Sequence, residues 1–83
     1  MGFFKTPMQK QAIYISDMID GLGKKGRKEL RKEMEIDRQD LIELREKLYR
    51  ISKGELADPE ELNMLQLMVE DIYEDYSDTD IDW

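Results

Sequence analysis

The chain has 83 residues, with 13 Lys or Arg against 20 Asp or Glu, so its formal charge at neutral pH is −7. This length predicts one small domain with a modest core, too small for a doubly wound cofactor-binding fold or a deeply enclosed active site. Cys and His are both absent, which excludes disulfides, thiolate nucleophiles, zinc fingers and imidazole-based catalytic or metal sites. We therefore expect a protein that is not an enzyme and that holds no cofactor or metal ion.

The composition favours an all-α fold. Charged and hydrophobic residues each make up 40% of the chain, with only five Gly and two Pro, a mixture typical of short amphipathic helices. The longest apolar stretches fall far short of the roughly 20 residues needed to cross a bilayer, and the first residues lack a signal-peptide core. We expect a single domain over residues 1–83 that lies in the cytoplasm and does not enter a membrane.

The first predicted helix covers residues 6–22. Thr6, Pro7 and Gln9 occupy the N-cap, N1 and N3 positions of a capping box. One apolar stripe follows at spacings of three and four and consists of Met8, Ala12, Ile15, Ile19 and Leu22. We expect Gly21 and Gly23 to end the helix, because glycine adopts the left-handed conformation of a helix C-terminus at little cost.

A second helical pattern runs over residues 25–52 and allows two interpretations. Its apolar stripe consists of Leu30, Met34, Leu41, Leu44, Leu48 and Ile51. A charged residue, Asp37, occupies one position of this stripe. We favour one long basic helix, continuous or slightly kinked, because neither Gly nor Pro enforces a stop. The alternative is a break at which Asp37 caps a new helix, with Asp40 at N3 and with Ile36 and Leu41 spaced as a hydrophobic staple.

Acidic and basic side chains alternate along the second half of this segment. Glu43 precedes Lys47 by four residues, and Glu46 precedes Arg50 by the same spacing. Pairs in this order attract each other across one helical turn, so two ion pairs within the helix are expected.

The last helix is predicted over residues 58–76, where Asp58 is the cap and Pro59 takes the N1 position. Its apolar stripe consists of Leu62, Leu65, Val69, Ile72 and Tyr76. The connection after residues 25–52 is about six residues long, so we expect the two helices to form an antiparallel C-terminal hairpin. Residues 77–83 form an acidic, aromatic tail. The expected fold is therefore an all-α domain of three or four helices.

The predicted core is drawn from all three helical patterns. It consists of Met8, Ile15, Ile19, Leu30, Leu41, Leu44, Leu48, Leu62, Leu65, Val69 and Ile72. Because these side chains lie on one face of each helix, we expect them to meet in a single apolar centre.

Charge divides the chain into two parts. All 13 basic residues lie in residues 1–53, which carry a net +4, whereas residues 54–83 carry −11. The densest basic cluster consists of Lys24, Lys25, Arg27, Lys28, Arg31 and Lys32. A Walker loop would need Gly-Lys-Ser/Thr after a buried strand, but here Gly26 is followed by Arg27. We interpret this segment as a flexible basic turn that leads into a helix and that can contact phosphates or an acidic partner.

The acidic final third is the main candidate for partner binding. Its predicted site residues are Glu70, Asp71, Glu74, Asp75, Asp78, Asp80 and Asp82, together with Tyr73, Tyr76 and Trp83. Carboxylates four residues apart on a helix lie about 6 Å apart along its axis. Such a row can stand in for the phosphates of a nucleic acid and compete for a basic groove, with fast and salt-sensitive association.

In size and charge, the chain resembles the small acidic DNA mimics and anti-defence inhibitors of phages, including some anti-CRISPR proteins. The resemblance implies an inhibitor that occupies the nucleic-acid-binding site of a partner protein. It rests on no shared motif, so it assigns no role to any single residue.

The tail adds a narrower hypothesis. Asp78, Asp80 and Asp82 alternate like the first ligands of a calcium loop, but the glycine and the bidentate glutamate that complete such a loop are missing. Acids that end in an aromatic residue resemble the C-terminal tip of bacterial and phage single-stranded-DNA-binding proteins. This resemblance implies that Ile81, Trp83 and the neighbouring acids act as a docking peptide.

The leading interpretation is therefore a non-enzymatic module whose acidic surface binds a basic protein of the nucleic-acid machinery. One alternative is a self-assembling structural or adaptor protein of a larger, phage-like assembly, in which oppositely charged parts of neighbouring copies associate. A third is weak direct binding of nucleic acid through residues 24–32. The simplest alternative is that the acidic face is only solvated or pairs with the chain's own basic helix.

Overall fold

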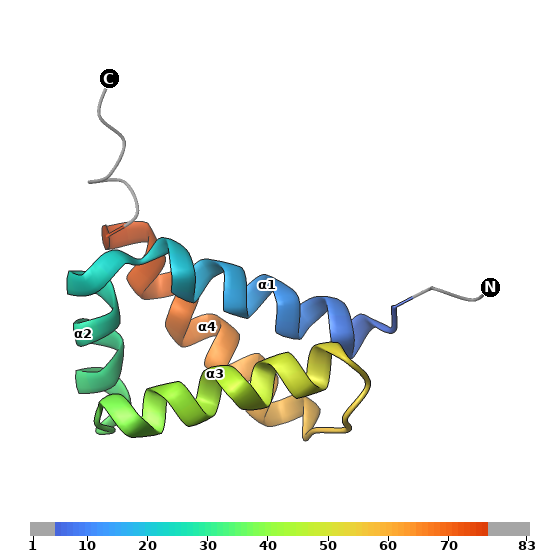
Figure 1. Cartoon of the computed structure of the whole chain (residues 1–83). Helices are drawn as coiled ribbons and strands as arrows, with labels where there is room; N and C mark the ends of the chain where they lie inside the picture. Colours follow the sequence, from blue (N-terminus) through green and yellow to red (C-terminus); the bar gives the residue numbers. More distant parts are fainter. Residues whose placement is uncertain (1–4, 77–83) are drawn as a thin grey trace.

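In a computed structural model, which describes residues 5–76, this part of the chain folds into four α-helices and contains no strand. The helices are α1 (Pro7–Gly21), α2 (Gly23–Met34), α3 (Arg38–Ser52) and α4 (Pro59–Tyr76) (Figure 1). The predicted all-α class is confirmed. The first and last helices, α1 and α4, each begin and end within two residues of their predicted bounds.

The favoured single helix over residues 25–52 is wrong, and the alternative break is confirmed. The chain turns at Glu35, which has a left-handed φ of 58°, and α3 then begins after Asp37. A reciprocal capping box fixes this start: the Asp40 amide donates to the Asp37 carboxylate at 2.8 Å, and the Asp37 amide donates to the Asp40 carboxylate at 3.3 Å. The break keeps Asp37 exposed, whereas a continuous helix would turn it toward the core together with the apolar stripe.

The segment expected to be a flexible basic turn is also helical. Only Leu22 separates α1 from α2, so the basic residues from Lys24 onward lie in the first turns of α2. Gly26 is buried there, and a Cβ atom at this position would lie 2.7 Å from the Leu22 Cβ and 3.2 Å from the Tyr76 Cβ. Glycine therefore lets α2 approach the end of α4 closely.

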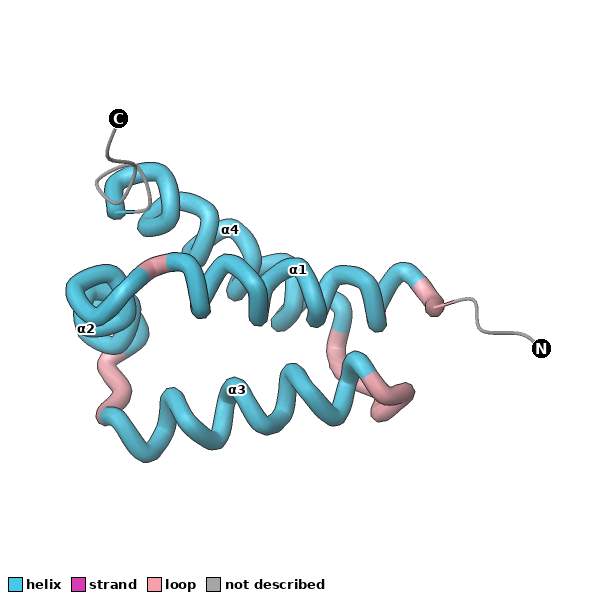
Figure 2. The backbone as a smooth tube through the Cα atoms, turned by 45° about the horizontal axis from the view of Figure 1, so that its top comes forward, coloured by secondary structure: helices cyan, strands magenta, loops and turns pink. Residues whose placement is uncertain are grey.

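Helix α1 is the element against which the others pack. It contacts α3 and α4 along most of its length, and α2 packs against the end of α4. Figure 2 shows α2 nearly end-on, where it links the end of α1 to the start of α3. Helix α4 runs back toward α2 behind α1 and α3 (Figure 1). The predicted antiparallel hairpin, with α3 and α4 side by side, is not confirmed, because these two helices make little direct contact.

Most of the predicted core is buried. Among the predicted core residues, Met8 and Leu44 are the two that are only half-buried. Both pack against the edge of the core. The core also contains four residues that were not in the predicted set, namely Ala12, Met18, Leu22 and Ile51. Three of those lie on the apolar stripes of the sequence, so only Met18 was missed by the periodicity.

Candidate functional site

The predicted acidic surface lies on α4. This helix has six acidic residues and no basic residue, and its buried side chains Leu62, Leu65, Val69 and Ile72 occupy one face. The carboxylates consequently lie on the remaining, outer part of the helix. Asp71, Glu74 and Asp75 are exposed, whereas Glu70 is half-buried.

The four predicted acids of α4 lie on two different flanks of the helix. Glu70 and Glu74 line a shallow hollow of about 380 Å³ beside α1, together with Tyr14 and Tyr73. Asp71 lies three residues after Met68, on the opposite flank that faces α3. Asp75, four residues further on, continues the same row. The structure therefore divides these acids into two pairs.

Glu70 is held by a polar network between α1 and α4. Its carboxylate accepts hydrogen bonds from the Tyr14 hydroxyl at 3.0 Å and from the Gln66 side-chain amide at 3.2 Å. Gln11 donates to Gln66 at 2.9 Å and to Asn63 at 2.7 Å. The hydrogen bond to Glu70, followed by partial desolvation, raises the pKa of Tyr14 above its usual value of 10.0. Sequence reasoning missed this network, because the residues that it joins between α1 and α4 are 52 to 56 positions apart in the chain.

The acids at the end of α4 are not neutralised by the basic α2. Within residues 5–76, no Lys or Arg lies within ion-pair distance of Glu70, Asp71, Glu74 or Asp75. The alternative in which this acidic face pairs with its own basic helix is therefore wrong for these four carboxylates. Asp71, Glu74 and Asp75 are exposed to solvent, whereas Glu70 is half-buried in its polar network.

The two predicted aromatic contacts on α4 lie toward the rest of the molecule. Tyr73 is half-buried against Gly21, and Tyr76 packs over Gly26 and donates a long hydrogen bond of 3.4 Å to Glu29. The Glu29 charge, followed by desolvation, raises the pKa of Tyr76. The remaining predicted site residues, Asp78, Asp80, Asp82 and Trp83, lie outside the described residues, so their docking role stays a prediction.

The structure joins the predicted basic cluster to two arginines that sequence reasoning did not include. Helices α2 and α3 border a hollow of about 500 Å³, in which seven of the nine lining residues are basic. The seven are Lys24, Lys25, Arg27, Lys28, Arg31, Arg38 and Arg45. Leu41 and the half-exposed Ile42 complete the lining. Arg38 and Arg45 are seven residues apart, a spacing that places both on one helix face, but only the turn at Glu35 brings that face to α2.

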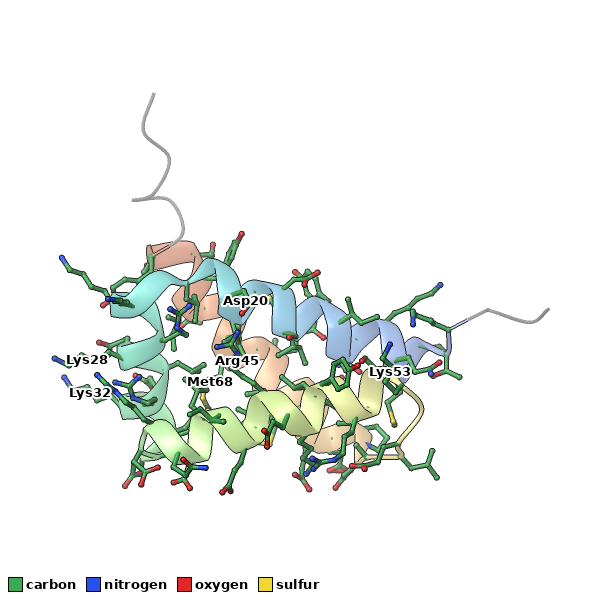
Figure 3. The ribbon with its side chains drawn as sticks, viewed as in Figure 1. Asp20, Lys28, Lys32, Arg45, Lys53 and Met68 are labelled. Atoms are coloured by element: carbon green, nitrogen blue, oxygen red, sulfur yellow. The ribbon has the colours of Figure 1, made fainter. Side chains whose placement is uncertain are left out.

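Not every basic residue of this hollow is available to a ligand. Arg45 forms an ion pair with Asp20 of α1 (Figure 3). Arg27 donates long hydrogen bonds of 3.5 and 3.4 Å to the carbonyls of Ile19 and Asp20 at the end of α1. Lys28 and Lys32 instead project away from the body of the molecule (Figure 3), and Lys32 does not line the hollow.

A third surface, which the sequence did not predict, is an apolar groove between α3 and α4. It has a volume of about 260 Å³ and is lined by Met34, Leu44, Lys47, Leu48, Ile51, Ala57, Asp58, Glu61, Leu62, Met64, Leu65 and Met68. Lys47 and Glu61 approach each other across it, at 3.9 Å. The predicted pairs of Glu43 with Lys47 and Glu46 with Arg50 are wrong, because Lys47 pairs with Glu61 and Arg50 pairs with Glu55.

The three surfaces are distinguished by acidic, basic and apolar side chains, respectively. In residues 5–76, no three acidic side chains come together as a metal site, and none of the helices is long and apolar enough to span a membrane. No protein-family model, curated protein or solved structure matches the chain. Its function is therefore argued from its own charged and apolar surfaces.

Proposed function

We propose that this protein is a non-enzymatic, cytoplasmic interaction module, of the kind that phage inhibitors represent, which occupies a basic, nucleic-acid-binding site on a partner protein. The observation that carries the proposal is the exposed and unpaired acidic end of α4. Asp71, Glu74 and Asp75 are all exposed, and no cation of the described chain lies within ion-pair distance of them.

Unpaired carboxylates on a rigid helix suit this function for a physical reason. Because no cation of the described chain is paired with these carboxylates, no internal ion pair competes with a basic partner for them. Six acids on 18 residues of one helix also give a concentrated negative field, which steers a basic partner and accelerates its association at low salt.

The test compares two triple variants that change the net charge equally. The site variant replaces Asp71 by Asn, Glu74 by Gln and Asp75 by Asn. The control variant makes the same kind of change at three exposed acids elsewhere, Asp17→Asn, Glu33→Gln and Glu46→Gln.

Each protein is immobilised and exposed to nuclease-treated bacterial lysate at low and high salt, and captured proteins are identified by mass spectrometry. We expect wild type and control to capture a basic nucleic-acid-binding protein that the site variant does not retain and that DNA displaces. Equal capture by all three proteins would contradict the proposal.

A second candidate function is self-assembly, which is favoured by the basic hollow between α2 and α3. Its five bases other than Arg27 and Arg45 are in no ion pair within residues 5–76, so the outer face of α4 on another copy would meet opposite charge there. Because these are two different surfaces, the contact would be head-to-tail and would build rings or filaments rather than closed dimers.

Light scattering distinguishes this candidate from the first. Self-assembly requires a mass that rises with concentration, falls in high salt and drops to the monomer when Arg38 is replaced by Glu. A monomer at every concentration would exclude it. Binding of labelled DNA that is lost in the same variant would instead favour the nucleic-acid-binding alternative.

A further inference from the structure

We infer that the groove between α3 and α4 is a docking site for one amphipathic helix of a partner protein, whose apolar face is bordered by Lys and Arg. The inference rests on the proposed function, because both require a basic partner. It deepens that function by naming the structural element of the partner that is bound, which is a helix.

The groove exists because α3 and α4 each pack on α1 rather than on each other. Leu48, Ile51, Leu62 and Leu65 are buried at its base, and the half-buried Leu44 lies on the α3 side. Nine of the twelve lining residues are apolar. A helix laid between α3 and α4 would cover this apolar surface and remove it from water.

The walls of the groove are rich in methionine. Met34, Met64 and Met68 line it, which is half of the six methionines in the chain. Methionine side chains are flexible and adapt to ligands of different shape, and they are used in this way at helix-binding grooves. From Glu61 to Met68 the α4 wall spans about 10 Å, which matches about two turns of a docked helix.

The charges around the groove select a cationic partner. Asp58 and Glu61 line it, and Asp71 continues its α4 wall toward α2. On the α3 wall, the single charged residue that lines the groove within residues 5–76 is Lys47, a cation. A helix with Lys or Arg beside its apolar face would meet opposite charge along the α4 wall, whereas an acidic helix would be repelled there.

Among the described residues, one weak ion pair spans the opening. The Lys47 and Glu61 side chains are 3.9 Å apart and are 46% and 71% exposed. Ion pairs this exposed contribute little to stability, so a docking helix displaces this pair at small cost. The released Glu61 carboxylate would then be free to pair with a basic residue of the partner.

The first test uses a synthetic 18-residue amphipathic helix made of Leu and Lys, with Leu on one face. A twin peptide has Glu in place of Lys, and the full-length protein carries ¹³C-labelled methionine methyl groups. We expect the Leu/Lys peptide to shift the methyl signals of Met34, Met64 and Met68 while Met8 and Met18, which lie outside the groove, stay unchanged.

Three outcomes would overturn the inference. The twin peptide could produce the same shifts, or the shifts could be spread over all five of these methionines. Alternatively, the same three signals could move with protein concentration in the absence of peptide, which would identify a second copy of this chain as the occupant.

The second test uses a matched pair of substitutions on α4. Met64 and Leu67 are both apolar, both 67% exposed and three residues apart, but only Met64 lines the groove. We expect Met64→Lys to weaken binding of the Leu/Lys peptide by about tenfold or more and Leu67→Lys to weaken it less than about threefold. Equal effects of the two substitutions would contradict the groove.

The same pair separates this inference from the proposed function. If a basic partner captured from lysate is lost in the triple variant of Asp71, Glu74 and Asp75 but binds Met64→Lys as well as wild type, the acidic surface stands and the groove inference fails. If that partner is lost in Met64→Lys and retained in Leu67→Lys, both stand.

Discussion

The two flanks of α4 face their neighbours in opposite ways. Toward α1, polar side chains interlock across the seam, and Glu70 accepts hydrogen bonds from Tyr14 and Gln66. Toward α3, apolar side chains line an open groove that a single exposed ion pair of Lys47 and Glu61 spans. One flank of the same helix therefore helps to hold the fold together, whereas the other leaves apolar surface uncovered.

The largest expected effect is the difference in stability loss between a substitution in the buried core and one on the groove wall. Ile15 is fully buried, so Ile15→Ala should lower the free energy of unfolding by about 2 to 5 kcal/mol. Met68 is half-buried on the groove wall, and Met68→Ala should cost less because solvent can fill the space. Urea denaturation of both variants measures the difference, and equal losses would show that the groove is closed in solution.

A smaller loss of stability is expected for a substitution at Gly26, where α2 approaches α4. At Gly26, alanine would favour a helix by about 1 kcal/mol on propensity alone. Its Cβ would, however, lie 2.7 Å from the Leu22 Cβ and 3.2 Å from the Tyr76 Cβ, so we expect Gly26→Ala to destabilise the protein by about 1 to 3 kcal/mol. A gain of stability in urea denaturation would mean that α2 and α4 are less tightly packed than described.

The hydrogen-bonded flank should respond to alkaline pH. Glu70 raises the pKa of Tyr14 above 10.0, so the folded protein holds this phenol proton more tightly than the unfolded chain does. The stabilisation is therefore complete below the unfolded pKa and is lost as pH rises through the folded one. We expect wild type to lose more stability than Tyr14→Phe as the pH rises above about 10.

Absorbance titration of the phenolate gives a direct measurement of this contact. Glu70→Gln should make one of the four tyrosines ionise at lower pH than in wild type. Tyr49→Phe, which removes the hydroxyl of an exposed tyrosine on α3, is the control for Tyr14→Phe, because each of these variants loses one titrating phenol. An unchanged titration curve in Glu70→Gln would contradict the contact.

The smallest expected effect concerns the ion pair that spans the groove. Lys47→Ala should change the free energy of unfolding by less than about 0.5 kcal/mol, because both side chains are largely exposed. The same substitution removes the one cation of the groove lining in the described chain, so binding of the Leu/Lys peptide should be strengthened. Weaker binding would argue that Lys47 contributes more through its aliphatic stem than through its charge.

Sequence reasoning located the helices well wherever the signal was local. The capping residues Thr6, Asp37 and Asp58 act on amides two or three residues away, so their patterns can be read directly. The choice between a long helix and a break at Asp37 was harder, because a stripe of apolar residues continues across the break. There the absence of Gly and Pro was outweighed by a capping box and by the left-handed residue Glu35.

The candidate surfaces were predicted unevenly for the same reason. The acidic face of α4 follows from helical spacing alone. For the basic hollow, only the lining residues on α2 were predicted. Arg38 and Arg45 line it because the chain turns at Glu35, and the favoured single helix has no such turn. The apolar groove was not predicted, because the last two predicted helices were expected to lie side by side as a hairpin.

By itself, the sequence determined that this protein is helical, where its first and last helices begin, which face of each helical pattern is apolar and how charge divides along the chain. These properties depend on interactions within about four residues, which helix geometry relates directly to spacing. Only the tertiary structure decided which apolar faces meet. Hydrophobic burial is non-directional, so the stripes of α3 and α4 could each pack equally well on the other or on α1. Because both pack on α1, the acidic α4 borders an open groove rather than a closed seam.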